Sequence, residues 1–381
     1  MNLKNRFSLL ITMILFLTCL LPASVYFYKN PSYNYDMLGY MALVIKMDKQ
    51  YTFEEIHKIT YESAKKNIPP ANYKNLTDTF TYRKKFKTDP NSFKEILPNY
   101  VIKPLYLWLS WLFYKNGCSL PLSTVLPSIV AYLIIGVILF FWLNKYLQTG
   151  FAFLTGLLLM YSTFITNVAR LSTPDCLSAL FILLSFYFII EKKNMWLMSV
   201  CLLLATYTRM DTVILYFFII SYLTFNSKWK MITGNQYLML LGVLVIAYLS
   251  IVLPVREYGW DIFYYGQYSS HIDYTKDFYQ SITIQSYFSL IYTKLVTAFV
   301  ATHFTLFLFL GIMVIFNRKF SFKSLSFDQS FLLLLIMVIF FRFLFLPDLS
   351  DRFYLGFYLL ILVLLAKKFS LKYLNPVNEN Y

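Results

Sequence analysis

The sequence predicts an all-α polytopic membrane protein, and three observations support this fold class. Of the 381 residues, 58% are hydrophobic and only 14% are charged, a balance that is not typical of soluble proteins. The mean hydropathy of +0.56 is correspondingly high. Apolar runs recur along the chain, and about ten of them predict transmembrane helices.

The charges favour a membrane surface over other partners. Lys and Arg number 34 against 19 Asp and Glu, which gives a formal net charge of +15. In a membrane protein such an excess is typical of cytoplasmic flanking residues and of contact with anionic head groups, so we expect no nucleic-acid partner. The four cysteines have neither a disulfide spacing nor a metal-ligand spacing. The sequence also lacks a Gly-rich nucleotide-binding loop.

The chain divides into three regions. The uncharged run at residues 7–27 predicts a membrane span, so residues 1–27 form the first transmembrane helix. Residues 28–103 are the long polar stretch of the chain and predict a large extracytoplasmic loop domain with amphipathic helices. Residues 104–381 return to apolar runs and predict a multi-helix transmembrane domain.

The loop domain carries recognisable helix starts. A helix from Asp36 to Lys46 is expected to lie along the membrane surface, because its apolar residues recur every three or four positions. The capping box at residues 52–55 predicts a second helix, and Asp89 before Pro90 predicts a third. The basic run at residues 83–87 reads as loop.

Further apolar runs predict the remaining spans. They lie at about residues 123–143, 151–168, 176–190, 195–208, 212–225, 236–253, 291–316, 330–347 and 353–366.

The connections between these runs differ in charge. If residues 7–27 cross from inside to outside, the predicted inner connections carry Lys145, Lys192, Lys193, Lys228, Lys230, Arg318, Lys319, Lys323, Lys367 and Lys368, as the positive-inside rule expects. The outer connections hold Arg170, Asp175, Arg209, Asp211, Arg256, Glu257, Asp261, Asp348, Asp351 and Arg352. The outer stretch 258–268 is rich in aromatic residues, as in an interfacial belt. Mixed charges on one side of the membrane indicate a shared external site.

Several outer segments together resemble a known superfamily. They are Asp36 after the first helix, the segment Lys103-Pro104-Leu105-Tyr106-Leu107-Trp108-Leu109, Leu126-Pro127-Ser128, Ala169-Arg170-Leu171-Ser172-Thr173-Pro174-Asp175, the segment at 204–211, and Asp351-Arg352-Phe353-Tyr354. In this order they resemble the C-type (GT-C) integral membrane glycosyltransferases, and are similar to protein O-mannosyltransferases and lipid A aminoarabinose transferases. The resemblance covers mainly the first 215 or so residues. One departure is Met37, where many relatives carry a second acidic residue.

The resemblance implies transfer of a hexosyl or pentosyl group from a polyprenyl-phosphate carrier to a lipid, glycan or protein acceptor on the extracytoplasmic face. Such chemistry needs a carboxylate base for the acceptor hydroxyl, for which Asp36 is the candidate, with Asp175 as the second catalytic carboxylate. A departing lipid phosphate needs cations. The substrate-binding candidates are Lys103, Arg170, Arg209, Asp211, Arg342 and Arg352. Arg342 lies inside an apolar run, where a charge needs a partner or an aqueous cavity.

No cofactor is required by this scheme, because Lys and Arg can stabilise a phosphate, although a divalent metal is compatible with it. The Leu-, Phe- and Ile-rich helices with many Lys, Asn and Tyr residues indicate an AT-rich genome. On this ground we expect a bacterial inner membrane, with the active site facing the periplasm or the cell exterior. Two other functions stay open, an O-antigen-type polysaccharide polymerase and a lipid-linked oligosaccharide flippase or transporter.

The site residues also have structural alternatives. Asp36 is placed to cap a helix, and Lys103 to extend from an apolar helix end towards water. Arg209 and Asp211 are close enough in sequence to pair with each other, and Arg352 follows directly on Asp351. Asp175 follows Pro174 in the first turn of its predicted helix, where the helix dipole favours a carboxylate.

Overall fold

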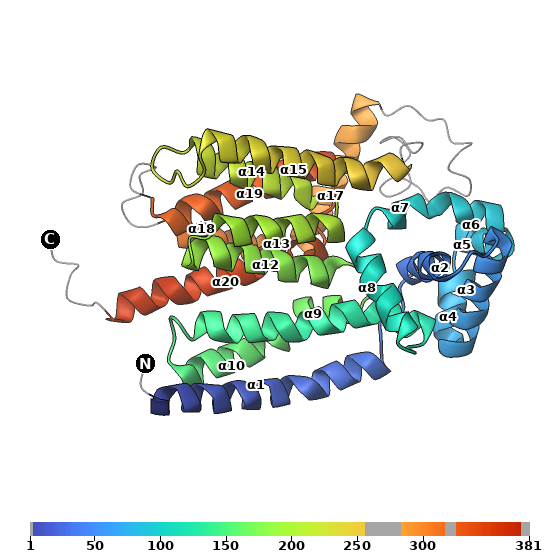
Figure 1. Cartoon of the computed structure of the whole chain (residues 1–381), viewed down its shortest axis with the longest axis horizontal. Coiled ribbons are helices and arrows are strands. Elements are labelled where there is room, and N and C mark those ends of the chain that lie inside the picture. Colours follow the sequence, from blue (N-terminus) through green and yellow to red (C-terminus); the bar gives the residue numbers. More distant parts are fainter. Residues whose placement is uncertain (1–2, 256–282, 317–324, 375–381) are drawn as a thin grey trace.

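A computed structural model describes residues 3–255, 283–316 and 325–374. Within these residues every regular element is a helix, which confirms the predicted all-α class (Figure 1). The one isolated β-bridge in the described part of the chain joins Ser32 to Leu171. The aromatic stretch 258–268 and the basic residues at 318–323 lie outside the described residues.

Four helices are long and apolar enough to cross a membrane. They are α1 (Leu3–Lys29), α9 (Leu120–Leu143), α15 (Gly234–Val252) and α19 (Phe327–Phe345). The described residues give up to six spans if each of two bent helix pairs counts as one, so length and composition of the helices do not confirm the expected number of ten.

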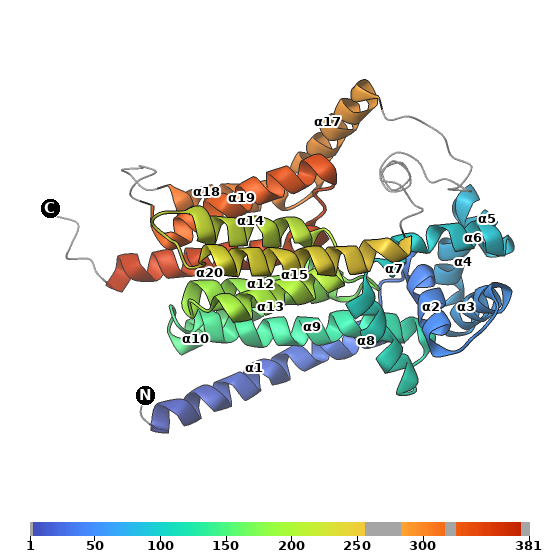
Figure 2. The same ribbon diagram turned by 45° about the horizontal axis from the view of Figure 1, so that its top comes forward.

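Four further helices of the bundle run beside these four (Figures 1 and 2). They are α12 (Asp175–Glu191), α13 (Met195–Thr208), α14 (Thr212–Phe225) and α20 (Asp351–Leu374). Helix α12 contacts α9, α13 and α20 and is buried along most of its length. It therefore forms the centre of the core.

Two of the predicted continuous spans are broken, and this part of the sequence prediction was wrong. The run at 151–168 divides into α10 (Thr149–Met160) and α11 (Thr163–Ala169), which meet at 60°. The run at 291–316 divides into α17 (Ile284–Ala301) and α18 (Phe304–Ile315), which meet at 79°. Figure 2 shows α17 leaving the bundle at this break.

The physical reason for the second break is a side-chain contact. The backbone N–H of His303 donates to Asp351 Oδ1 at 2.9 Å, instead of continuing the hydrogen-bond ladder of α17. Hydropathy along the sequence does not reveal such a contact, because the acceptor lies on another helix.

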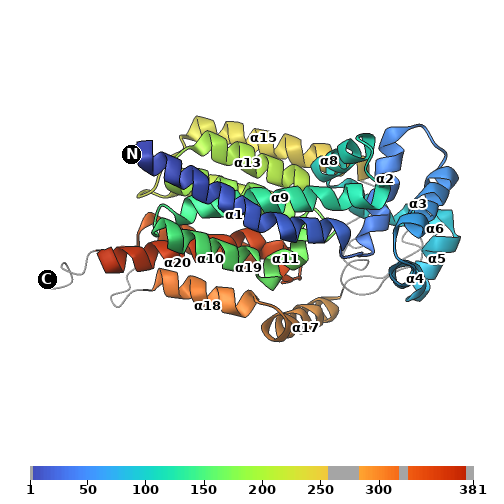
Figure 3. The same cartoon turned by 90° about the horizontal axis from the view of Figure 1, so that it is seen from below.

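The polar region of the chain folds into short helices that gather at one end of the bundle (Figures 1 and 3). They are α2 (Asp36–Asp48), α3 (Phe53–Asn67), α4 (Pro70–Asp78), α5 (Thr81–Thr88), α6 (Pro90–Ile96) and α7 (Pro98–Val101). Helix α8 (Pro104–Lys115) then leads back to the bundle.

Local signals located two of these helices correctly. The predicted capping box at Thr52 is formed in both directions with Glu55. Asp89 accepts a hydrogen bond from the N–H of Asn91 at 2.9 Å and caps α6 as expected.

The basic run at 83–87 was wrongly predicted as loop, since it lies in α5. Tyr82 and Phe86 are both buried and lie four positions apart, so they share one face of this helix. Packing of that face stabilises a helix whose charged residues alone do not indicate one.

Helix α2 begins at Asp36 as predicted, but it is not a surface helix. It is buried on all sides from Met37 to Ile45 and contacts α3, α7, α8 and α9. The expectation of a helix along the membrane surface was therefore wrong. Burial fixes α2 firmly, and with it the position of Asp36.

The segment between α1 and α2 lies along the junction of α11 and α12. The N–H of Ser32 donates to the carbonyl oxygen of Arg170 at 2.9 Å. The N–H of Ser172 donates to Asn34 Oδ1 at 3.2 Å. These bonds bring Asp36, which follows two residues later, to the start of α12.

A glycine in α2 tests how tightly this region is packed. A Cβ at Gly39 would overlap the ring of Tyr100, so Gly39→Ala is expected to destabilise the protein by roughly 1–3 kcal/mol. Thermal unfolding in detergent measures the change. Gly242→Ala in α15 is the control, because a Cβ there meets no atom within 4 Å and alanine is the better helix former. Equal melting temperatures for the two variants would contradict the tight contact.

Candidate active site

Six charged side chains form a continuous network in which carboxylates and guanidiniums alternate. In order of contact they are Asp36, Arg352, Asp175, Arg209, Asp211 and Arg342. We call them the ionic network. They come from α2, α20, α12, the α13–α14 connection and α19. The fold therefore brings together segments that are far apart in the sequence.

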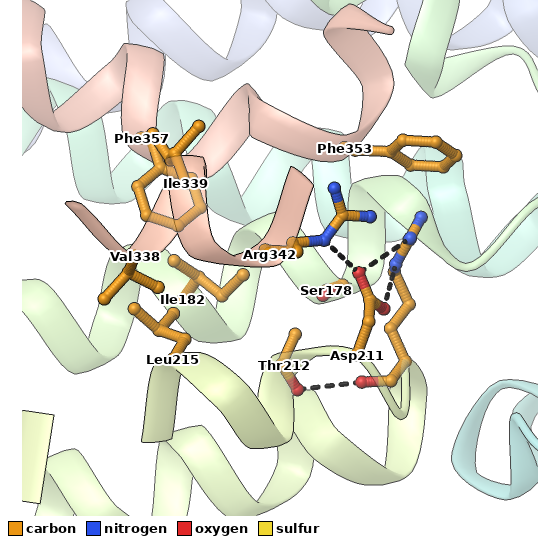
Figure 4. Close-up of a pocket in the computed structure, with 11 residues that line it drawn as sticks. Ser178, Ile182, Asp211, Thr212, Leu215, Val338, Ile339, Arg342, Phe353 and Phe357 are labelled. Carbon is orange, nitrogen blue, oxygen red and sulfur yellow. Dashed lines mark hydrogen bonds and ion pairs between the residues drawn. The ribbon is translucent and has the colours of Figure 1, made fainter. Parts of the chain in front are cut away.

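Asp211 holds the buried half of this network. Arg209 donates to it from Nε at 3.0 Å and from Nη2 at 3.1 Å, and Arg342 donates from Nε at 2.6 Å (Figure 4). Burial raises the pKa of the Asp211 carboxyl, but the two guanidiniums outweigh that effect and hold the pKa well below its ordinary value. Asp211 is consequently ionised and committed to its two partners.

Asp175 is the first residue of α12 and is buried. Arg209 Nη1 donates to its Oδ1, and Arg352 Nε lies 3.9 Å from its Oδ2. Each carboxylate oxygen of Asp175 thus faces one guanidinium, Oδ1 that of Arg209 and Oδ2 that of Arg352.

Phe353 lies among all three arginines. Its ring centre is 4.1 Å from the guanidinium of Arg209, 4.7 Å from that of Arg352 and 5.1 Å from that of Arg342. An aromatic face attracts cations and separates them sterically. The ring therefore keeps three like charges apart within one site.

Tyr354 completes the surroundings of Arg342. Its hydroxyl accepts from Arg342 Nη1 at 2.6 Å and donates to the carbonyl oxygen of Asp348 at 3.1 Å. The charge inside the apolar run at Arg342 is thereby paired with Asp211 and hydrogen-bonded, as a charge at that depth requires.

Asp36 and Arg352 form the accessible half of the ionic network. Arg352 Nη1 lies 3.6 Å from Asp36 Oδ2, and each side chain is 35% exposed. The contacts of Arg352 with Asp36 and Asp175 are longer than a hydrogen bond, so its N–H groups are available to a ligand.

Two side chains orient the Asp36 carboxylate. Asn34 Nδ2 donates to Oδ2 at 3.2 Å, and the hydroxyl of Tyr100 donates to Oδ1 at 3.4 Å. These donors are side chains and not helix amides, which separates the observed role of Asp36 from helix capping.

Lys103 lies close to the same carboxylate. Its ammonium donates to the carbonyl oxygen of Asn99 at 2.8 Å and lies 5.4 Å and 5.3 Å from the ring centres of Tyr40 and Tyr100. Burial lowers the pKa of Lys103 to about 8, and the negative charge of Asp36 opposes this shift only in part. Lys103 is therefore a cation that titrates close to neutral pH.

Arg170, like Lys103, is a predicted site residue that does not join the ionic network. Its Nε donates to the carbonyl oxygen of Asn30 at 3.0 Å, and its guanidinium lies 5.2 Å from the ring centre of Tyr26. The side chain thus lies against α1, away from the carboxylates of the network.

Asp351 pairs with His303 and not with its neighbour Arg352. His303 Nδ1 lies 2.7 Å from Asp351 Oδ2, and the hydroxyl of Tyr358 donates to Oδ1 at 3.2 Å. The bonds of Asp351 fix the start of α20, from which Arg352 extends into the site.

A small cavity of about 20 Å³ adjoins Asp211 and Arg342 (Figure 4). Ser178 lines it, and the Ser178 hydroxyl has no hydrogen-bond partner among the described residues. Such a volume accommodates a single water molecule and no sugar. Substrate contact is therefore expected at the exposed side, where Asp36 and Arg352 lie.

Three residues of the site were not identified from the sequence, namely Asn34, Tyr100 and Phe353. Phe353 was part of a recognised segment, but only the cations around it define its role. Tyr100 lies 64 positions from Asp36, and no local pattern links them. Among the described residues, no three side chains of His, Cys, Asp or Glu converge as metal ligands.

Comparison with known proteins gives one family match. Residues 101–255 match the model of the dolichyl-phosphate-mannose-protein mannosyltransferase family. This segment contains Lys103, Asp175, Arg209 and Asp211, and the match confirms the predicted resemblance to GT-C glycosyltransferases over its length. It supports a membrane glycosyltransferase of this type. No curated protein and no solved structure shows a significant match to the chain.

The pairing of Asp211 with Arg209 and Arg342 can be tested by measuring the stability of a variant. Asp211→Asn leaves two buried guanidiniums without their shared carboxylate, and is expected to destabilise the protein by roughly 3–5 kcal/mol. Thermal unfolding in detergent measures the loss. Asp78→Asn is the control, because Asp78 pairs with Lys87 at the surface, where a pair contributes about 1 kcal/mol or less. Similar melting temperatures for the two variants would show that Asp211 is not a central structural partner.

Proposed function

We propose that the protein transfers a sugar from a polyprenyl-phosphate carrier to an acceptor hydroxyl on the extracytoplasmic face. The observation that carries this function is the pair formed by Asp36 and Arg352. A carboxylate and a guanidinium, each 35% exposed, lie 3.6 Å apart beside a buried ionic support. This arrangement places a base and an anion-binding group next to each other, as glycosyl transfer from a lipid phosphate needs.

In the proposed reaction Asp36 accepts the proton of the acceptor hydroxyl as its oxygen attacks the anomeric carbon. The bond from that carbon to the phosphate oxygen breaks, and the lipid phosphate leaves with the bonding electrons. Arg352 and Lys103 stabilise the negative charge on the leaving phosphate. Asn34 and Tyr100 hold the Asp36 carboxylate in position.

The remaining charged residues support this pair. Asp175 is covered, so we assign it the positioning of Arg352 and Arg209 and not a proton transfer. Arg209, Asp211 and Arg342 satisfy one another and hold the ends of α12, α14 and α19 together. Since Arg352 and Lys103 supply the positive charge, the proposed reaction requires no cofactor.

We also propose that the bundle crosses the membrane about ten times, with each bent pair as one span. Helices α13 and α14 have 14 residues each, short for a span, but both run among longer helices. The basic α9–α10, α12–α13 and α14–α15 connections lie at the end opposite to α2–α7 (Figure 1). By the positive-inside rule that end faces the cytoplasm, and the site faces the periplasm or cell exterior of a bacterial inner membrane.

The proposed base is tested by Asp36→Asn, which keeps the shape of the side chain but removes the proton acceptor. Transfer from a labelled polyprenyl-phosphate sugar is expected to fall by about 10²–10⁴-fold. Product formation in reconstituted vesicles provides the measurement, with a panel of lipid-linked sugars because the sugar is not specified by these residues.

Asp78→Asn serves as the matched control for the base variant, because it alters an aspartate of α4 that pairs with Lys87 and has no ion pair with the ionic network. It is expected to retain full transfer. Retained transfer in Asp36→Asn, with the variant inserted and folded, would remove Asp36 from the catalytic role.

Lys103 gives a pH-dependent prediction. Its pKa of about 8 means that the cation is present below that pH and is lost as the pH rises through it. The value of kcat/KM for donor is therefore expected to fall above pH 8, approaching about tenfold per pH unit. Lys103→Arg should abolish this decline between pH 8 and 10, because a guanidinium stays charged. An unchanged decline in Lys103→Arg would assign the titration to another group.

A further inference from the structure

A groove lies between α1 and the bent pair α10–α11, apart from the ionic network. Its volume is about 380 Å³. Its walls are formed mainly by Ala23, Tyr26, Phe27, Tyr161, Thr166 and Arg170. Both walls belong to candidate membrane spans. The groove therefore opens at a surface that bilayer lipid contacts.

Helix α1 and the bent pair α10–α11 diverge at the groove for two local reasons. Helices α10 and α11 meet at 60°, and Pro22, which has no backbone N–H, interrupts the ladder of α1 at the groove. The hydroxyl of Tyr161 donates to the carbonyl oxygen of Cys19 at 2.6 Å and ties the helices together beside the opening. The groove is thus held open by backbone geometry.

Arg170 is the charged residue of the lining. Its Nε donates a hydrogen bond to the carbonyl oxygen of Asn30. Among the described residues no carboxylate lies within 4 Å of its guanidinium, whereas the other two arginines of the outer helix ends, Arg209 and Arg352, both have such partners. A cation at the edge of an apolar membrane groove is costly without a counter-charge. The terminal nitrogens of Arg170 are the donors available for one.

We infer that the groove is a binding site for a bilayer phospholipid. The lipid phosphate pairs with the guanidinium of Arg170, in the forked geometry that guanidinium and phosphate share. One acyl chain lies along the apolar wall formed by Ala23 and Phe27 of α1. No acidic residue lines the groove, so a phosphate meets no opposing charge there.

The separation of Arg170 from the ionic network favours a bilayer lipid over a substrate as the occupant. Leu21, Val25 and Tyr26 are 50–53% exposed on the same stretch of α1, so the groove is continuous with the lipid-facing surface. Arg170 makes no contact with the carboxylates of the ionic network. This binding does not depend on the proposed glycosyl transfer.

A bound lipid would also anchor the segment that carries Asp36. The carbonyl oxygen of Arg170, which lines the groove, accepts a hydrogen bond from the N–H of Ser32. Ligands that bind only the folded state raise its stability. Added phosphatidylglycerol is therefore expected to raise the melting temperature.

The test uses the full-length protein in detergent with phosphatidylglycerol added back, and measures retained lipid by native mass spectrometry and melting temperature by titration. The wild type is expected to retain one phosphatidylglycerol. Arg170→Gln should bind it about tenfold more weakly, the effect of losing one charge-assisted contact. Lys29→Gln is the matched control, because Lys29 is an exposed cation at the same end of α1 but not in the groove.

A second variant keeps the test decisive if Arg170→Gln does not fold. Thr166→Phe fills the groove from α11 and leaves the charge in place, and should lose the lipid to a similar extent. Equal retention by wild type and either groove variant would overturn the inference. Displacement of phosphatidylglycerol by an equimolar amount of polyprenyl phosphate would overturn it too, because the groove would then be a donor site.

Discussion

The pairing of Asp211 with Arg209 and Arg342 is the interaction on which the rest of the site depends. Two guanidiniums in a buried position require a shared carboxylate, and that carboxylate fixes α13, α14 and α19 relative to one another. Arg209 then reaches Asp175 at the start of α12. The centre of the bundle is therefore joined to its later helices by charge as well as by apolar packing.

The buried and the partly exposed members of the ionic network have different roles. The buried members use their donors and acceptors on each other, so they are rigid and have little capacity left for a ligand. Asp36 and Arg352 are partly exposed and only loosely paired at 3.6 Å. The buried ion pairs thereby hold the partly exposed Asp36 and Arg352 in position.

The two helix breaks both lie close to the elements that carry Asp36 and Arg352. The break between α17 and α18 is fixed by Asp351, the residue next to Arg352. The bend between α10 and α11 leads into the bridge that holds the segment before Asp36. Departures from regular helix geometry are tolerated in a membrane bundle where neighbouring groups satisfy the freed backbone. Both breaks here lie beside elements that position the pair Asp36 and Arg352.

The sequence by itself determined the all-α class, the positions of most helices and the charged residues near their ends, because hydropathy and capping are local properties. The sequence also showed the family resemblance, which the family match over residues 101–255 confirms. Only the tertiary structure decided which charges meet. Asp351 pairs with His303 while Arg352 reaches Asp36 and Asp175, and Arg170 stays apart. These pairings, like the two breaks, depend on contacts between helices distant in the chain, and no pattern within one helix records its partners.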